Sequence, residues 1–313
     1  MASRAEAARV AIAPRAKRAR AGFWTDAARR LRRDPTTMVA LVILGVMVLV
    51  AASADLLATH VFHVTLAEQD LLRTYQKPTL AEPAYWLGSD DLGRSQVVRL
   101  VYGARVSLFI GIFGALVALG IGVTLGMSAA YFGGWWDDIV IWLVTTLEGI
   151  PLLFLLILVG VYFQLTPVSL AILIGALGWL GICNLSRGQT LALREREYVL
   201  AARALGVSSP RIMFRHILPN LLPLMIVSMM LSVGGIILGE AALSFLGFGI
   251  QPPQPSWGNM LSGATQFYFR GPHLIVVPGI AISITVLCLA LVGDGLRDAF
   301  DPRLGRSTSD RRT

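Results

Sequence analysis

The chain has 313 residues, of which 55% are hydrophobic and 15% are charged, and its mean hydropathy is +0.66. Because the apolar residues form blocks of about 20, the length needed to cross a bilayer, these figures exclude an ordinary soluble protein. The net charge of +8 comes from clusters that flank the apolar blocks and not from a folded basic domain, which argues against a nucleic-acid-binding protein.

Residues 1–37 form a basic tail that we place in the cytoplasm. Within this tail Phe23, Trp24, Ala27 and Leu31 recur at helical spacing among arginines. This pattern predicts an amphipathic segment. It either lies at a membrane surface with its arginines near anionic headgroups, or is a basic flank that only sets topology. Both interpretations put the N-terminus inside the cell.

We predict the first transmembrane helix at residues 38–59. The sequence Ala52-Ser53-Ala54 resembles a signal-peptide cleavage site. The basic region before it is far longer than a signal peptide normally carries, so we expect the helix to be retained. Residues 60–104 lack an excess of positive charge and are predicted to form an external segment.

Five further apolar blocks follow within residues 105–297, and a polar tail at residues 298–313 ends the chain. The blocks lie at about residues 106–131, 139–163, 168–185, 221–246 and 274–296. Basic clusters stand in one internal loop and in the C-terminal tail. The pattern therefore predicts an all-α membrane protein with six transmembrane helices and both termini in the cytoplasm.

The second block carries a ridge of small residues at intervals of four, namely Gly114, Ala118, Gly122 and Gly126. In a membrane such a ridge lets another helix approach closely. We therefore predict a helix-packing seam along this side of the second helix.

The third block contains Pro151, which lacks a backbone N–H and is predicted to kink the helix. Glu148 lies just before it. An ionisable residue in such a segment suggests a functional role, but its carboxylate could also bond the backbone groups that the kink exposes. We take it as a candidate for the transport pathway together with Glu240, Asn184 and Gln189.

The internal loop at residues 186–220 is too long for a simple turn. The run that starts at Tyr198 favours a helix, which Gly206 is expected to end. Ser208-Ser209-Pro210 then starts a second helix, which is expected to end at Pro219. One apolar face of the first helix must be covered by a membrane surface or by a partner's groove. Its residues are Tyr198, Ala201, Ala202 and Leu205.

This loop resembles the cytoplasmic EAA loop of ABC importer permeases, through the run from Glu197 to Gly206 and through His216-Ile217-Leu218-Pro219-Asn220. In that family the loop forms a coupling helix that docks into a groove on the ATP-binding subunit. The resemblance implies this role for Glu197, Tyr198, Leu200, Ala201, Ala202, Arg203, Leu205, Gly206, His216 and Pro219. Leu200 stands where the motif has a glutamate. Docking through helix shape and apolar contact is expected to remain, but a polar contact from that glutamate is not carried over.

Two further stretches resemble the dipeptide, oligopeptide and nickel permeases of the same family. Residues 86–94 with 102–108 are similar to their outer segment, and residues 240–249 with 255–258 are similar to the end of their fifth span. The resemblance covers about residues 23–302. It implies the type I ABC importer permease fold, the second of the two permeases of such a system, and a place in the inner membrane.

Such a permease works with partner chains. The resemblance implies a second permease subunit, one or two ATP-binding subunits and an extracytoplasmic substrate-binding protein, assembled in a lipid bilayer. The sequence contains no G-x-x-x-x-G-K-[ST] phosphate loop, no catalytic motif and no metal-ligand spacing around its two cysteines. We therefore assign ATP and Mg²⁺ to the partner subunits, and neither a cofactor nor enzyme activity to this chain.

The predicted function is import of di- or oligopeptides, driven by ATP that other subunits hydrolyse. Within the family, nickel or another small solute is the alternative cargo, because the external binding protein selects it. Outside the family, a self-sufficient secondary transporter would be expected to show an inverted repeat or polar clusters within the membrane. A membrane-anchored scaffold would need a sizeable soluble domain, and neither tail is large enough.

Overall fold

The computed structural model describes residues 15–262 and 264–301, which are built from helices and connecting loops. The α-helices are α1 (Arg15–Leu31), α2 (Pro35–Ala52), α3 (Ala54–Leu57), α4 (Gln96–Phe132), α5 (Gly134–Glu148), α6 (Leu152–Tyr162), α7 (Pro167–Leu177), α8 (Leu180–Arg194), α9 (Glu197–Ala204), α10 (Ser209–Ile212), α11 (Leu218–Phe245), α12 (Trp257–Met260), α13 (Ala264–Phe267) and α14 (His273–Phe300). Single π-helical turns follow α3 and α10. The all-helical class predicted from the sequence is confirmed.

Four helices are long and apolar enough to cross a membrane by themselves: α2, α4, the continuous helix over residues 209–245, and α14. Two bent pairs pass the same test when each pair is taken as one span. The α5–α6 pair bends by 78° and the α7–α8 pair by 44°. The described chain thus holds the six predicted spans if each bent pair is one of them.

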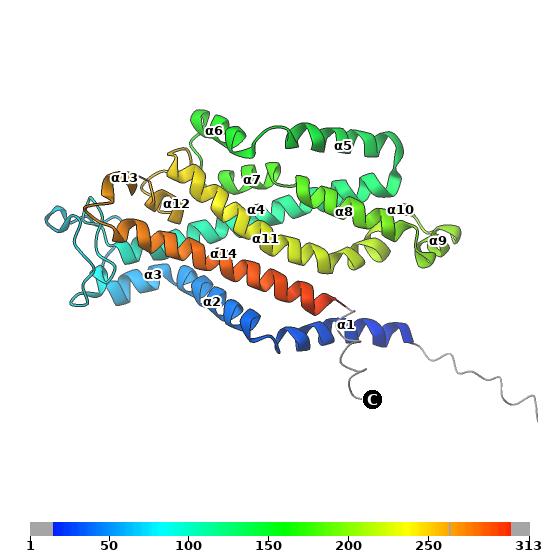
Figure 1. The fold of residues 1–313 in the computed structure, drawn as a ribbon, viewed down its shortest axis with the longest axis horizontal. Helices are drawn as coiled ribbons and strands as arrows, with labels where there is room; N and C mark the ends of the chain where they lie inside the picture. Colours follow the sequence, from blue (N-terminus) through cyan, green and yellow to red (C-terminus); the bar gives the residue numbers. More distant parts are fainter. Residues whose placement is uncertain (1–14, 263, 302–313) are drawn as a thin grey trace, which may run out of the picture.

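The two ends of the helix bundle are formed by different segments of the chain (Figure 1). At one end lie α3, α12, α13 and the loops between α3 and α4. At the other end lies α9, and α1 and the end of α14 lie toward the same side. This arrangement agrees with the predicted topology, in which the segment after the first span lies opposite the internal loop, and the helices next to the two tails share a side with that loop.

The bend between α5 and α6 lies where Pro151 predicts it. Pro151 has no N–H to continue the hydrogen bonds of α5, and it becomes the residue that precedes α6. The bend between α7 and α8 was not predicted. There the Gly178 N–H still bonds the Ile174 carbonyl at 2.8 Å, and the chain then turns at Gly178 and Trp179 into α8.

Several boundaries differ from the sequence-based prediction; α8, for example, runs to Arg194, into the loop predicted from residue 186. Two of the differences have a clear cause. The helix of the second span starts at Gln96, inside the segment predicted as external, because its first turns are covered by protein. Gln96 and Arg99 are both buried. The second helix of the internal loop does not end at Pro219 but continues into α11. A π-helical turn over Met213–Ile217 ends two residues before this proline. Its hydrogen bonds span five residues and not four, so the turn is wider, and the proline ring avoids the backbone carbonyl that it would meet in a regular α-helix.

The N-terminal segment forms a helix, as its spacing predicts, and packs on the end of α14. Ala27 is buried, and the rings of Trp24 and Phe300 meet edge to face at 5.6 Å. Arg30 donates a hydrogen bond of 2.7 Å to the Asp301 carbonyl. Before α2, the hydroxyls of Thr36 and Thr37 donate to the helix-capping carboxylate of Asp34 and lower its pKa below the ordinary value.

The small-residue ridge on α4 is a packing seam, as predicted. Gly114, Ala118, Gly122 and Gly126 are all buried. A Cβ built on Gly122 would lie 2.8 Å from the Trp179 carbonyl oxygen. One built on Gly126 would lie 2.3 Å from the carbonyl oxygen of Cys183 in α8. The backbones of α4 and α8 can approach this closely only because these positions carry no side chain.

We expect Gly126→Ala to destabilise the fold by about 2–3 kcal/mol, because its methyl group meets backbone atoms that a rotamer change cannot move. Gly120→Ala on the same helix is the matched control, since a Cβ there has nothing within 4 Å. This control should leave stability unchanged or raise it by roughly 0.5–1 kcal/mol through helix propensity. Thermal unfolding of both variants in detergent measures the difference, and equal midpoints would contradict the seam.

Candidate functional site

The helix α9 lies at the end of the molecule opposite α12 and α13 (Figure 1). Its residues favour a helix, and Val199 and Ala202 stand three apart, on one side. Val199 is 0% exposed and Ala202 is buried. Both belong to the apolar cluster that contains Ile212 and Ile217, from the segment that leads into α11. The helix is therefore part of the fold and not a free connector.

The end of α9 is a Schellman motif. The Val207 N–H bonds the Ala202 carbonyl at 3.1 Å, and the Gly206 N–H bonds the Arg203 carbonyl at 3.0 Å. Gly206 has φ +75°, a backbone conformation that glycine adopts freely and that strains a residue with a side chain. The predicted end of the helix at Gly206 is confirmed. After it, Val207 packs against the apolar cluster that contains Val199 and Ala202.

Polar contacts tie the neighbouring helix ends together. The Arg187 guanidinium in α8 donates twice to the Asp137 carboxylate in α5, with both distances at 2.6 Å. Arg194 donates to the Ala130 carbonyl of α4 at 2.5 Å. The Arg203 guanidinium of α9 lies 5.3 Å from the centre of the Tyr131 ring. The helix α9 is therefore in contact with α4 as well as with the segment that leads into α11.

The outward face of α9 differs from the face predicted. Tyr198, Ala201 and Leu205 are exposed, as expected, and Leu205 is 83% exposed. Ala202 was predicted to belong to this face but packs inward beside Val199. Leu200, which replaces the glutamate of the motif, is exposed. Val199, the inward anchor, was not predicted, although its spacing of three from Ala202 places the two on one side of the helix.

The remaining predicted coupling residues lie around this helix. Glu197 and Arg203 are exposed on α9 itself. His216 lies in the following helical segment, where its ring is 6.4 Å from that of Tyr198. Pro219 lies in the first turn of α11. Asn220 donates to the Tyr198 hydroxyl at 3.3 Å and to the His216 carbonyl at 2.6 Å, so the two helical segments are linked by side chains.

Two of the four predicted pathway residues meet. The Asn184 amide in α8 donates to the Glu148 carboxylate at the end of α5, at 3.1 Å. The alternative prediction, that Glu148 bonds backbone exposed by the Pro151 kink, has no such bond among the described residues. Both side chains are exposed, and so is Gln189 further along α8. The structure thus places the Glu148–Asn184 pair where the two bent spans face each other.

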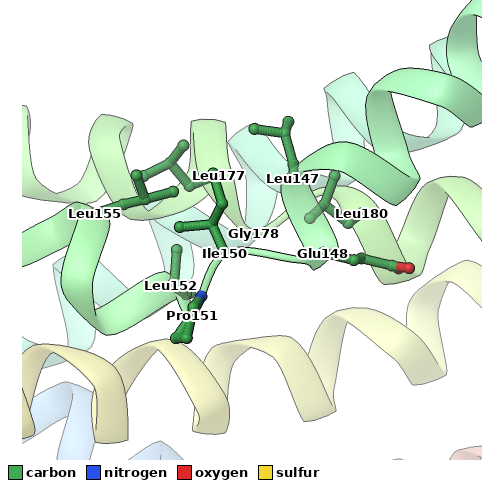
Figure 2. A pocket seen from close by; sticks show the side chains of 9 residues that line it. All are labelled: Leu147, Glu148, Ile150, Pro151, Leu152, Leu155, Leu177, Gly178 and Leu180. Carbon is green, nitrogen blue, oxygen red and sulfur yellow. The ribbon is translucent and has the colours of Figure 1, made fainter.

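A cavity of about 290 Å³ opens beside this pair, between the two bends. Figure 2 shows its apolar side chains around the turn at Ile150 and Pro151, with the Glu148 carboxylate at one edge, pointing away from Leu152. The lining residues are Leu147, Glu148, Ile150, Pro151, Leu152, Leu155, Leu177, Gly178 and Leu180.

Glu240, the fourth predicted pathway residue, is 0% exposed. Its carboxylate accepts hydrogen bonds from three hydroxyls, those of Ser107 at 3.2 Å, Ser244 at 2.7 Å and Ser256 at 2.6 Å. Each serine oxygen also accepts a backbone N–H, from Trp257, Ile250 and Asn259 respectively. The structure gives Glu240 a role inside the fold, in place of the pathway role predicted, because the loop after α11 folds back over it.

Comparison by sequence identifies the family. The family described as "Binding-protein-dependent transport system inner membrane component" matches residues 122–306, more than half of the chain. The chain belongs to this family. The "N-terminal TM domain of oligopeptide transport permease C" matches residues 22–78. The first match contains the bent spans and α9, and the second contains α2 and α3.

Curated relatives of this permease match most of its length. It is 38% identical over 286 residues to the dipeptide transport system permease protein DppC of Alkalihalophilus pseudofirmus, with 90% of each chain covered. It is 38% identical over 281 residues to the oligopeptide transport system permease protein OppC of Haemophilus influenzae, covering 90% of this chain and 89% of that one. It is 40% identical over 221 residues to the glutathione transport system permease protein GsiD of Pectobacterium atrosepticum, covering 71% of this chain and 73% of that one.

These findings confirm that the chain is a permease of the ABC importer type and an inner-membrane component with several spans. It is the membrane subunit of such a system, not a catalytic one. The family's description also implies an ATPase and a substrate-binding protein as partners. Within residues 15–262 and 264–301, no group of three or more His, Cys, Asp or Glu side chains is arranged to hold a metal ion.

Proposed function

We propose that this permease imports di- or oligopeptides and forms half of their translocation pathway. The peptide class rests on the transport systems for which its relatives are named. The observation that carries the mechanism is α9, a short helix anchored inward by Val199 and Ala202 that keeps an apolar outer face exposed. A monomer does not usually leave such a face open, so it is suited to docking on a partner.

The partner on that face is an ATP-binding subunit, whose groove takes Tyr198, Leu200, Ala201 and Leu205. When two such subunits close on ATP, they displace α9. Because α9 shares one apolar cluster with α4, α8 and α11, the displacement reaches the helices that line the pathway. Transport is then a shift of population between outward-open and inward-open states.

The assembly contains a second permease subunit, one or two ATP-binding subunits and an external substrate-binding protein, in a lipid bilayer. ATP and Mg²⁺ are bound by the ATP-binding subunits. In this division residues 105–297 are the permease core, residues 186–220 are its coupling loop, and residues 1–37 and 298–313 are cytoplasmic tails. Glu148, Asn184 and Gln189 face the pathway, because an exposed carboxylate and two amides are poorly suited to lipid.

The assignment is tested by purifying the tagged chain from its native membrane in mild detergent. We expect a second permease and one or two ATP-binding chains to co-purify, and the reconstituted complex to take up a tripeptide only with ATP and the binding protein present. A chain that purifies alone and moves solute in liposomes without ATP would overturn the proposal and favour a secondary transporter.

A further inference from the structure

The carboxylate of Glu148 has no charged partner in the part of the chain that the structure describes. In that part its hydrogen-bond donor is the neutral amide of Asn184. Among the described residues no Lys, Arg or His lies within ion-pair distance of it. The neighbouring hydroxyls of Thr145 and Thr146 are used on carbonyls of their own helix. A carboxylate has about four acceptor sites, so most of its capacity is open.

The surroundings make an open carboxylate costly. It stands at the end of α5, at the bend of one apolar span, and residues at the bend of a second span line the same cavity. An acid within such segments is usually paired or lines an aqueous path. In the same helix Asp137 has an arginine partner, whereas Asp138 and Glu148 have no ion pair among the described residues. Of these two acids, Glu148 is the one that lines the cavity between the bends.

The cavity beside Glu148 is apolar. Its volume of about 290 Å³ lies just below the range for small-ligand pockets, roughly 300 Å³ and above, and suits one or two side chains of a peptide. The side chains that form its walls are Leu147, Ile150, Leu152, Leu155, Leu177 and Leu180. Figure 2 shows the carboxylate at the rim and the leucines around the hollow.

We infer that this site binds the amino-terminal residue of a peptide cargo, with the ammonium group on Glu148 and the first side chain in the leucine-lined cavity. The inference rests on the proposed peptide import and adds a specific subsite to it. An organic ammonium fits better than a metal ion, because the described residues supply a single carboxylate there and no set of further ligands.

The test uses the purified complex of permeases and ATP-binding subunits without the external binding protein, whose own specificity then does not enter. The probes are Leu-Gly-benzoylphenylalanine, whose third residue is photoreactive, and its N-acetyl form, so that no residue lining the cavity is changed to introduce the label. We expect the free peptide to label the chain about tenfold more than the acetylated one, as for one charge-assisted hydrogen bond. Glu148→Gln should bring this ratio to about one, and Glu148→Asp should keep most of it.

Asp138→Asn is the matched control, because it removes an exposed carboxylate from the same helix about 15 Å away by helical rise. It should leave the labelling ratio unchanged. Equal labelling by both peptides before the Glu148 change, or no labelling by either, would overturn the inference. So would loss of the second permease from the Glu148→Gln complex, which would assign the carboxylate to a subunit interface. If the proposed peptide import itself is wrong, the result differs from these outcomes, because the unmodified complex then shows no ATP-dependent uptake of Leu-Gly-Gly.

Discussion

Glu240→Ala is expected to lower the stability of the permease by roughly 3–6 kcal/mol, because three buried serine hydroxyls lose their shared acceptor. The removed side chain also leaves a cavity in a fully buried place. Since the same serines hold the backbone of residues 250–259, the loop should come away from α4 and α11. The thermal unfolding midpoint in detergent should fall by roughly 10 °C.

Two variants separate this effect from the loss of a charge. Glu240→Gln keeps an acceptor oxygen and should lose clearly less stability than the alanine variant. Glu68→Ala removes an exposed carboxyl whose recorded bond is to the Thr65 N–H, and should change the midpoint by no more than about 1 °C. If Glu240→Ala unfolds at the temperature of the unmodified chain, the serine cluster does not hold the loop.

Gly206→Val is expected to uncouple ATP hydrolysis from transport. A β-branched residue at φ +75° is strained by about 1–3 kcal/mol, so the last turn of α9 should open and the exposed Leu205 should leave its place. We expect at least about a tenfold loss of peptide transported per ATP hydrolysed. The measurement is uptake and ATPase activity of the reconstituted complex, with and without the binding protein.

Gly206→Asn is the control for this prediction, because asparagine enters the left-handed region at small cost. A Cβ at this position has nothing within 4 Å, so neither variant should act through a clash or stop the chain from assembling. Coupling should survive in the asparagine variant. If the valine variant and the unmodified complex transport equally much peptide per ATP hydrolysed, the geometry at the end of α9 is not needed to pass the movement of the ATP-binding subunits to the permease.

Most of the fold could be predicted because span length and the sides on which basic residues cluster are local properties of the sequence. The seam on α4 was also predictable, since small residues four apart in a membrane helix usually let another helix pack closely against it. The start of α4 at Gln96 could not be predicted. Hydropathy reports how apolar a segment is, whereas Gln96 and Arg99 are covered by other parts of the protein.

For α9 too, one part could be predicted from the sequence and another could not. Helix propensity and Gly206 predict where α9 forms and where it stops. Which of its faces turns inward depends on the partners that α11 and its preceding turn bring to it, so Ala202 was assigned to the wrong side.

The all-helical class, the apolar segments long enough to cross a membrane and the family could be read from composition, from charge placement and from short motifs. The contacts of the acidic residues could not, and they came only with the tertiary structure. Glu148 and Glu240 are both acids in apolar helices, and neither Pro151 near the one nor Ser244 near the other tells which of them is enclosed by protein. Contacts between residues far apart in the chain do so, since Ser107 and Ser256 enclose Glu240 while Asn184 leaves Glu148 open at the rim of a cavity.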